Sequence, residues 1–272
     1  MLLIAYVPGF KPPAETSSEN SGILPFSPTE NDKFTLLCTL AQDESTSPYA
    51  YFLLGFDGVQ KQISVTRLFP QTVLSENRTP RIILKETFDK DGAGGAATAL
   101  NQRFSINISK YICFTNDSLL GFFDLFNSVV LNVPQNLSQV DKQKDIYIKI
   151  DKGRQSLSGV LLIDYIACTV WQEGNSQVLY QSANAVTEFI RQNHEALSLA
   201  LDTKAEDYIL SSTKTNLSVT DIENRRELIS YLLFESGDGV VTLAVDGEFK
   251  NGNTEFHLDE QSVSNILSNY GI

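Results

Sequence analysis

The stretch that decides the fold is Asp91–Pro134, which reads DGAGGAATALNQRFSINISKYICFTNDSLLGFFDLFNSVVLNVP. Its glycine cluster leads into small and apolar residues, which predicts the start of a helix. The apolar run Tyr111–Phe114 is short enough to be a strand, and apolar residues recur at helical spacing over Leu119–Phe126. Val129–Val133 is a β-branched strand stopped by the proline that follows it. Helix, strand, helix and strand in this order predict an α/β unit whose sheet is buried on both faces.

The composition indicates a globular chain without a nucleic-acid surface. Of its 272 residues, 42% are hydrophobic, which is enough to bury a sizeable core. The formal net charge is -12, whereas binding to a phosphate backbone needs clustered lysine and arginine, so we exclude nucleic acid as a partner. Cys38, Cys113 and Cys168 lie in apolar runs without metal-ligand spacing. They are predicted to be buried free thiols.

Residues 1–33 differ from the rest and are predicted to be an N-terminal tail and linker. Residues 1–7, MLLIAYV, are far fewer than the roughly 20 residues that a membrane span needs. They fit a remnant of a membrane anchor, a first strand or a disordered tip. Residues 8–32 are rich in proline, serine, threonine and glutamate, as linkers are.

After residue 33, short apolar strands alternate with amphipathic helices. This alternation predicts one three-layer α-β-α domain over residues 34–272 with a mixed central sheet. We expect loops over residues 85–91 and 135–144, and a strand at Asp145–Ile150. The strands expected in the central sheet are Phe34–Leu40, Tyr51–Phe56, Ile63–Leu68, Tyr111–Phe114 and Val240–Val245. The helices expected in the second half are Val160–Ala167, Gln177–Leu201, Ala205–Ser212, one capped by Ser218 that reaches Phe234, and one capped by Asp259 that reaches Tyr270.

The order of these pieces resembles the LytR-CpsA-Psr domain. The resemblance rests on the glycine pair and its helix, the I-x-K-Y strand, the F-x-x-L-F-N helix and the V-V-L-N-V-P strand. It continues in Lys152–Gly159, which reads KGRQSLSG, in the long helix headed by Gln181, and in Thr215-Asn216. The resemblance implies an extracytoplasmic domain, on the cell-surface side of a bacterial membrane, that attaches glycopolymers to the cell wall from a polyprenyl diphosphate carrier.

The resemblance also implies an active site, and this sequence departs from it. Members of the family hold the pyrophosphate with several arginines, whose planar fork suits phosphate oxygens, and position a divalent metal with aspartates. The positions that align with that site are Gln42, Asp43, Tyr49, Gln71, Ala167, Thr169, Tyr180 and Gln181. None of them carries an arginine. We therefore expect a degenerate site without catalysis and without a cofactor, magnesium being expected only if the family activity is retained.

An apolar cleft for the polyprenyl chain is a further expectation from the resemblance. The residues predicted to line it are Phe114, Phe122, Phe123, Phe126, Val160, Leu161 and Ile163. Ordinary core packing is the alternative for each of them. The expected partners are a polyprenyl lipid or lipid-linked glycan, and a cell-wall polymer or envelope protein. The sequence predicts no particular oligomeric state.

Three functions fit these patterns. The first is a degenerate domain that binds a polyprenyl-linked ligand or a partner, and the missing arginines favour it. The second is an active phosphotransferase with a site rebuilt from glutamines and Asp43. The third is a nucleotide-binding α/β protein that uses Gly92, Gly94 and Gly95, which match G-x-G-x-x-A. The loop expected over residues 85–91 speaks against the third function, because this fingerprint needs a tight strand-to-helix turn.

The remaining charged residues show no catalytic or metal-binding pattern. His194 and His257 are far apart in the sequence and are predicted to be surface or structural residues. We expect Asp141, Asp145, Asp151 and Asp164 on solvated loops, and Arg103, Arg154, Arg225 and Arg226 on the surface.

Overall fold

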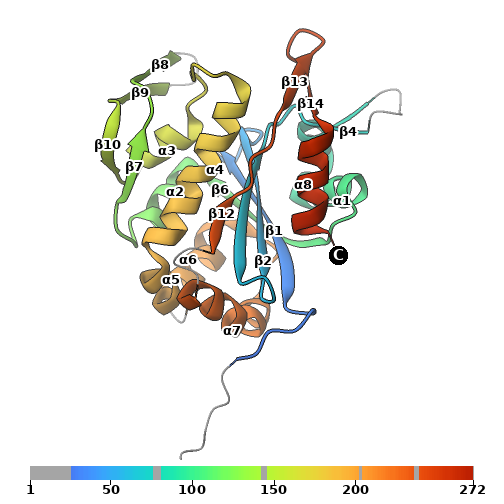
Figure 1. The fold of residues 1–272 in the computed structure, drawn as a ribbon, viewed down its shortest axis with the longest axis vertical. Coiled ribbons are helices and arrows are strands. Elements are labelled where there is room, and N and C mark those ends of the chain that lie inside the picture. Colours follow the sequence, from blue (N-terminus) through green and yellow to red (C-terminus); the bar gives the residue numbers. More distant parts are fainter. Residues whose placement is uncertain (1–25, 76–80, 142–145, 202–203, 236–238, 272) are drawn as a thin grey trace, which may run out of the picture.

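A six-stranded mixed sheet forms the centre of the protein (Figure 1), in a computed structural model that describes residues 26–75, 81–141, 146–201, 204–235 and 239–271. The strand order is β11-β6-β1-β2-β3-β12. β1, β2 and β3 pair antiparallel, whereas β6 runs parallel to β1 and β12 parallel to β3. All five strands expected in the central sheet belong to it, and the predicted fold class is confirmed. The strands are β1 (Lys33–Ala41), β2 (Ala50–Asp57), β3 (Gln62–Leu68), β6 (Ile108–Thr115), β11 (Lys214–Thr215) and β12 (Val240–Thr242).

Helices cover both faces of this sheet (Figure 1). One face carries α1 (Leu84–Phe104) and α8 (Glu260–Tyr270). The other face carries α2 (Asn116–Phe123), α3 (Val160–Ala167) and α4 (Asn175–Gln192), and α5 (His194–Ala200), α6 (Lys204–Ser212) and α7 (Val219–Glu235) lie at its lower end in Figure 1. The tail and possible anchor are expected over residues 1–33, of which 1–25 lie outside the described residues. In the remainder the ring of Phe26 packs on that of Tyr231, with centroids 5.5 Å apart, and Lys33 begins β1. The domain boundary at residue 34 stays a prediction.

Two predicted helix starts are confirmed by their caps. The backbone N–H of Asp221 donates to Ser218 Oγ at 3.2 Å, and the N–H of Ser218 donates to Asp221 Oδ2 at 3.0 Å. The N–H of Ser262 donates to Asp259 Oδ1 at 2.6 Å. In both places a short polar side chain satisfies a backbone donor that the first helical turn leaves free.

Two helices differ from expectation. The glycine cluster lies inside α1, because residues 85–91 are helical and the chain kinks at Gly92, whose φ of 66° favours glycine. The single helix expected over residues 177–201 is wrong, since α4 ends at Gln192 and α5 begins at His194. Between them the buried Asn193 donates to the carbonyl of Phe189 at 3.1 Å and accepts from the N–H of Asn127 at 2.9 Å. This side chain ends the helix and ties it to a loop.

In the part of the chain that the structure describes, four two-stranded sheets lie around the central one. The expectation that residues 129–133 belong to a sheet buried on both faces is wrong, because this strand pairs only with residues 153–157 and alternates between buried and less buried side chains. Residues 135–144 were expected to form a loop, yet 137–141 pair with 146–150. The pairs are β7 (Val129–Val133) with β10 (Gly153–Leu157), β8 (Leu137–Asp141) with β9 (Ile146–Ile150), β13 (Gly247–Lys250) with β14 (Glu255–Leu258), and β4 (Val73–Ser75) with β5 (Ile82–Ile83).

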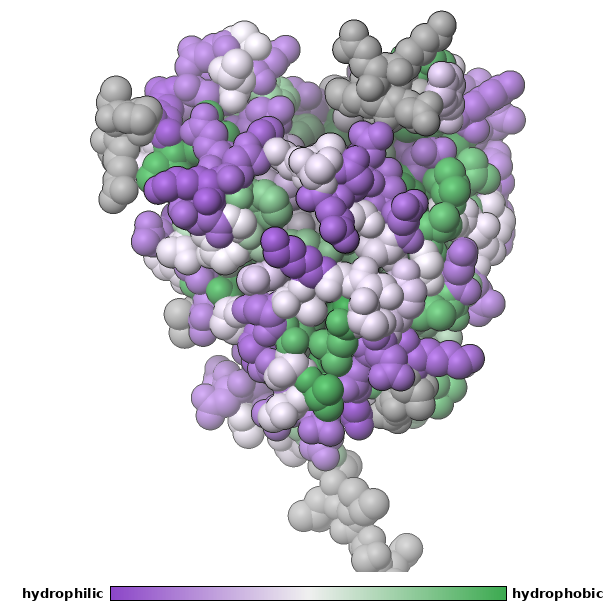
Figure 2. Space-filling view, turned by 180° about the vertical axis from the view of Figure 1, so that it is seen from behind, coloured by the Kyte–Doolittle hydropathy of each residue, from purple (hydrophilic) through white to green (hydrophobic). Residues whose placement is uncertain are grey.

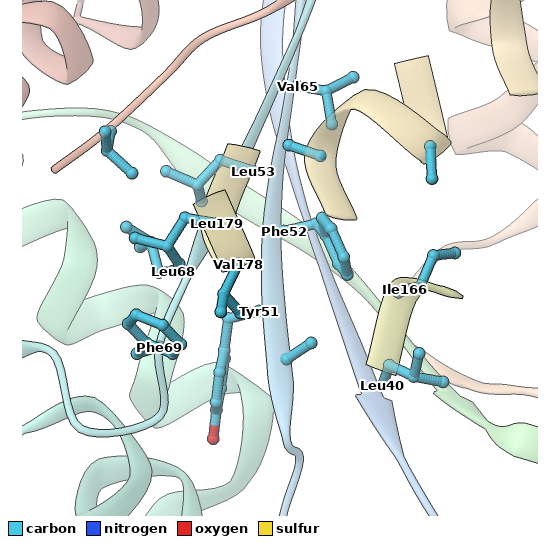
Figure 3. Packing of buried hydrophobic residues seen from close by; sticks show 14 of the residues in the cluster. Leu40, Tyr51, Phe52, Leu53, Val65, Leu68, Phe69, Ile166, Val178 and Leu179 are labelled. Atoms are coloured by element: carbon cyan, nitrogen blue, oxygen red, sulfur yellow. The ribbon is translucent and has the colours of Figure 1, made fainter. Parts of the chain in front are cut away.

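The side chains of neighbouring residues in β2 point to opposite faces of the sheet. Figure 3 shows Leu53 and Phe52 pointing to different sides of this strand, as the strand period of two requires. On the α1/α8 face, the buried hydroxyl of Tyr270 shares a hydrogen bond with Thr66 Oγ1 at 2.8 Å and donates to the carbonyl of Leu53 at 3.2 Å. A Cβ added at Gly55 would lie 2.7 Å from the Tyr270 ring, so this face is packed tightly enough to need glycine there.

Candidate functional site

An apolar cavity of about 240 Å³ lies on the other face of the sheet, between β1, β2 and β6 and helices α2 and α4–α7. Phe34, Leu36, Cys38 and Leu40 all line it, because every second residue of a strand points to the same face. From Phe34 to Leu40 the cavity follows β1 for roughly 20 Å, at about 3.3 Å per residue. An elongated apolar space of this kind suits a chain-like apolar ligand.

Three of the seven residues expected to line an apolar cleft do so, namely Phe114, Phe122 and Phe123. Phe126 packs behind them, with its ring centroid 5.2 Å from that of Phe122 and 5.5 Å from that of Phe189. The structure places the three residues expected from α3 outside the cavity. Val160 and Leu161 are 57% and 43% exposed, Ile163 is buried in the core, and Ile166 is the residue of α3 that lines the cavity.

One end of the cavity meets several positions that align with the family site. Leu40 and Phe114 are partners across β1 and β6 at this end, and Gln42 and Asp43 follow directly after β1. The N–H of Tyr49 donates to the carbonyl of Leu40 at 2.9 Å. Ala167 follows the cavity-lining Ile166 in α3. The topology therefore brings Gln42, Tyr49 and Ala167 to the Leu40 end of the cavity.

The other aligned positions lie around this group. The phenol of Tyr165 donates to Gln181 Oε1 at 2.8 Å, and Tyr180 is largely exposed on the same helix. Thr169 is exposed, and its N–H donates to Gln139 Oε1 at 3.0 Å. The carbonyl of Gln71 accepts from the N–H of Phe256 at 2.8 Å, which places this residue beside β14. Gln181 and Thr169 are therefore bonded to neutral partners, and Tyr180 is 42% exposed.

The sequence interpretation missed Arg67, whose side chain is only 2% exposed. Its Nη1 donates to the carbonyls of Ile166 and Val178, each at 3.2 Å, and to Ser182 Oγ. Burial lowers the pKa of this guanidinium to about 10, and Tyr49 acts in the opposite direction. Arg67 thus ties β3 to α3 and α4 beside the aligned positions. The signal that could have found it is a lone arginine inside the apolar strand ISVTRL.

Two titratable groups near Arg67 are shifted by burial. Asp164 was expected on a solvated loop, but it lies in α3, half-buried, and desolvation raises the pKa of its carboxyl. Burial also raises the pKa of the Tyr49 phenol. Its hydroxyl donates to Asn116 Oδ1 at 2.8 Å. In both groups burial favours the neutral form, because it disfavours a charge that has little contact with water.

A polar cleft of about 820 Å³ lies on the α1 side of β1 and β6. It shares the wall residues Thr39 and Phe114 with the apolar cavity. Asp43 is exposed there, and hydrogen bonds from the side chain and backbone of Ser45 lower the pKa of its carboxyl. The cleft is rich in hydroxyl groups, from Ser45, Thr46, Ser47, Thr115, Ser118, Ser211, Ser212 and Thr213.

The residues at the family's metal positions do not fit a divalent cation. The two aligned aspartates correspond to Asp43 or its neighbour Gln42 and to Tyr49, whose hydroxyl is engaged with Asn116. Magnesium is bound through carboxylate and phosphate oxygens, and a single exposed carboxylate is a poor site. Within the described ranges, no group of three or more histidine, cysteine, aspartate or glutamate side chains is placed to hold a metal.

Charged residues stand at the opposite end of the cavity, near Phe34 and Leu36. Lys110, Glu206, Asp221 and Arg225 line the cavity there. Arg225 and Arg226 were expected on the surface, but the guanidinium of Arg225 lies 5.1 Å from the centroid of the Phe34 ring and Arg226 Nη2 donates to Glu206 Oε2 at 2.9 Å. The aliphatic part of an arginine packs on apolar surface while its head keeps polar partners, which explains this placement.

The histidines, cysteines and glycine cluster show no site of their own. His194 Nδ1 bonds with the carbonyl of Arg191 at 2.8 Å, and the buried His257 pairs with Glu255 at 3.0 Å. The three cysteines are free, as predicted, but only Cys168 is buried, whereas Cys38 and Cys113 are partly buried. The glycine cluster lies in the middle of α1, so it does not form the strand-to-helix turn of a dinucleotide site.

One family model matches this chain over most of its length. The model of the LytR_cpsA_psr family matches residues 45–270, and the chain therefore belongs to this family. Its members are linked to the assembly of cell-wall glycopolymers. Comparison with curated proteins gives no match.

Solved structures support the same fold. A crystal structure described as that of a transcription regulator from Eubacterium siraeum DSM 15702 is 23% identical, with a TM-score of 0.79, over 95% of this chain and 98% of the other. TagT bound to LIIa-WTA is 15% identical, with a TM-score of 0.65, over 90% of this chain and 92% of the other. TagV of Bacillus subtilis is 15% identical, with a TM-score of 0.64, over 87% of this chain and 94% of the other. At these identities the likeness concerns the fold alone.

Among the residues that the structure describes, no helix combines the length and hydrophobicity needed to cross a membrane.

Proposed function

We propose that this chain is a divergent LytR-CpsA-Psr domain of bacterial envelope assembly that binds a polyprenyl-linked ligand and does not transfer glycopolymer. The observation that carries the proposal is the apolar cavity along β1, whose Leu40 end lies among the positions aligned with the family site. The tail of the ligand would lie on Leu36, Cys38 and Leu40, with its polar head near Gln42 and Tyr49. Extracytoplasmic placement and a cell-wall polymer or envelope protein as partner belong to the same proposal.

The loss of charge argues against catalysis. Phosphoryl-type transfer depends on cations that stabilise the charge developing on phosphate oxygens. Removal of one such stabilising group typically costs on the order of a hundredfold in rate, so replacement of all the family's arginines leaves no measurable turnover. Glutamine at positions 42, 71 and 181 donates hydrogen bonds but neutralises no charge. The net charge of -12 also disfavours the approach of an anion.

Arg67 does not replace the missing arginines in this proposal. Its Nη1 is already used by two helix carbonyls and a hydroxyl, and its side chain is buried between β3 and the two helices. Its Nε makes no hydrogen bond but is buried as well, so a phosphate that approaches from solvent does not reach it. The second candidate function is an active phosphotransferase whose site is rebuilt from glutamines and Asp43.

The two candidates differ in turnover. Purified protein is supplied with a lipid-linked glycan diphosphate, magnesium and a peptidoglycan acceptor, and polymer transfer and phosphate release are measured. We expect none. Turnover that disappears in Asp43→Ala or Gln71→Ala would establish the phosphotransferase and overturn the proposal.

Lipid binding is tested separately with farnesyl phosphate as the probe. Val186 lines the cavity from α4, whereas Val160 lies outside it on α3, so the two valines form a matched pair. We expect Val186→Phe to weaken binding at least tenfold, because the ring occupies the cavity, and Val160→Phe to bind like the wild type. Equal affinities of the two variants, or no binding by the wild type, would contradict lipid binding in this cavity.

A further inference from the structure

The charged end of the cavity has a defined place along the sheet. Lys110 is the register partner of Leu36 in the parallel pairing of β6 with β1, and Arg225 stacks over Phe34. The positions aligned with the family site lie at Leu40, the other end. The charged residues therefore lie where the far end of a bound chain would arrive, about 20 Å from its head.

These residues are joined into one group, which we call the ionic end wall. Lys110 Nζ donates to Asp221 Oδ2 at 2.6 Å, and Arg225 Nη1 donates to the carbonyl of Asp221 at 3.0 Å. Next to them, Arg226 pairs with Glu206 at 2.9 Å. The wall thus connects β6, α6 and α7, and consists of Lys110, Glu206, Asp221, Arg225 and Arg226.

The wall lies close to the surface of the protein. The side chains of Lys110 and Asp221 are 22% and 21% exposed, whereas Ile222, which lines the cavity beside them, is buried. Figure 2 shows a small apolar patch just below the middle of the molecule, bordered by hydrophilic residues. At this end the cavity is thus lined by paired, partly exposed charges together with apolar side chains such as Ile222.

It costs more free energy for an apolar chain to displace paired charges than to displace aliphatic side chains. A chain that passed between Lys110 and Asp221 would separate the pair and leave each charge against hydrocarbon, which is costly when no new partner is gained. An apolar wall residue, by contrast, leaves no charge unpaired when it moves, so displacing it costs only part of its packing. The ionic end wall is therefore the part of the cavity surface that an incoming tail displaces least.

We infer that the ionic end wall sets the length of the lipid chain that the cavity holds, which makes Lys110 and Asp221 specificity-determining residues. This inference rests on the proposed function, since it concerns the tail of the same ligand. Chains that end before the wall gain affinity with every added isoprene unit. In longer chains the additional units stay outside the cavity and add no affinity.

The test uses a series of prenyl phosphates of increasing length on the full chain: geranyl, farnesyl, geranylgeranyl and undecaprenyl phosphate. The opening variant is Lys110→Met with Asp221→Asn, which removes the ion pair without changing the net charge and keeps an acceptor for the cap of α7. The control is Lys250→Met with Glu248→Gln, an ion pair of 2.7 Å on the β13–β14 hairpin, away from the cavity.

We expect the affinity of the wild type and the control to level off within the series. In the opening variant the ratio of undecaprenyl to farnesyl affinity rises about tenfold, because further methylene groups are buried. Leu217→Trp, at the charged end of the cavity, should shorten the longest chain that fits. The affinity for geranylgeranyl phosphate relative to that for geranyl phosphate should then fall roughly tenfold. This second variant keeps the test valid if the opening variant does not fold.

The outcomes separate the two claims. If the wild type binds prenyl phosphates but both variants keep its length profile, the ionic end wall does not set chain length and this inference is wrong. If the wild type binds none of the four, the proposed function fails and this inference fails with it.

Discussion

The two faces of the central sheet are built from the same strands but differ in packing. On the α1/α8 face, Tyr270 fits against Gly55 and bonds with Thr66, which leaves no space for even one added methyl group. On the face covered by α4–α7, Leu54, one residue away in β2, borders the cavity. Because adjacent residues of a strand point to opposite faces, one face can stabilise the fold while the other keeps room for a ligand.

The largest effect is expected on the packed face. Tyr270→Ala removes a fully buried ring and two hydrogen bonds, so the free energy of unfolding should fall by about 3–5 kcal/mol. Urea unfolding followed by circular dichroism measures it. As a comparison on the hollow face, Phe122→Ala should cost clearly less, since this ring already borders empty space. Equal losses at the two positions would mean that both faces are packed alike.

Larger side chains at two neighbouring positions of β2 test the difference between the two faces more sharply. Leu53→Phe overfills the packed face and should destabilise by about 1–3 kcal/mol, whereas Leu54→Phe extends into the cavity and should cost less than about 0.5 kcal/mol. Thermal unfolding of the two variants in parallel checks this. A Leu54→Phe variant as unstable as Leu53→Phe would indicate that the cavity closes up in solution.

The smallest expected effect is on the stability of the fold at low pH. A hydrogen bond from Lys110, followed by one from Ser218, lowers the pKa of Asp221 to about 2. A carboxyl whose pKa is lower in the folded state stabilises the fold above its unfolded pKa of about 3.9, and this contribution is lost as the pH falls toward 2. With screening by solvent we expect about 1 kcal/mol.

Asp221→Asn isolates this contribution, because asparagine does not titrate but still accepts the bonds that cap α7. Stability is measured by urea unfolding at several acidities between pH 5 and pH 2. As the pH falls from 5 to 2, the free energy of unfolding of the wild type should lose its excess over that of the variant. A constant difference between the two proteins at every pH would refute the assignment to Asp221.

The central sheet could be predicted because its strands are short, apolar and β-branched. The same reasoning failed where tertiary contacts determine the secondary structure. The apolar period of residues 177–201 continues through Asn193, and only its bonds with Phe189 and Asn127 show that the helix ends there. β10 lies in a polar stretch, so its pairing with β7 left no hydrophobic signal in the sequence.

The site was predictable in part. Gln42, Tyr49 and Ala167 come together because each lies next to, or is bonded to, a residue at the Leu40 end of the cavity. The fold alone determines this arrangement, so recognising the fold was enough to predict it. The face of α3 was not predictable, because nearly all its residues are apolar and no period distinguishes Val160 from Ile166. Arg67 could not be placed by comparing aligned positions, since it occupies none of them.

The helix break at Asn193 also has a consequence for local opening. α5, which follows the break, contains no buried residue, although Leu197 and the adjacent Leu201 line the cavity. A segment with so little burial unfolds locally at a small fraction of the free energy that opens the core strands. We therefore expect the amide hydrogens of α5 to exchange with deuterium far sooner than those of β1 and β2, and their exchange to slow when a ligand fills the cavity.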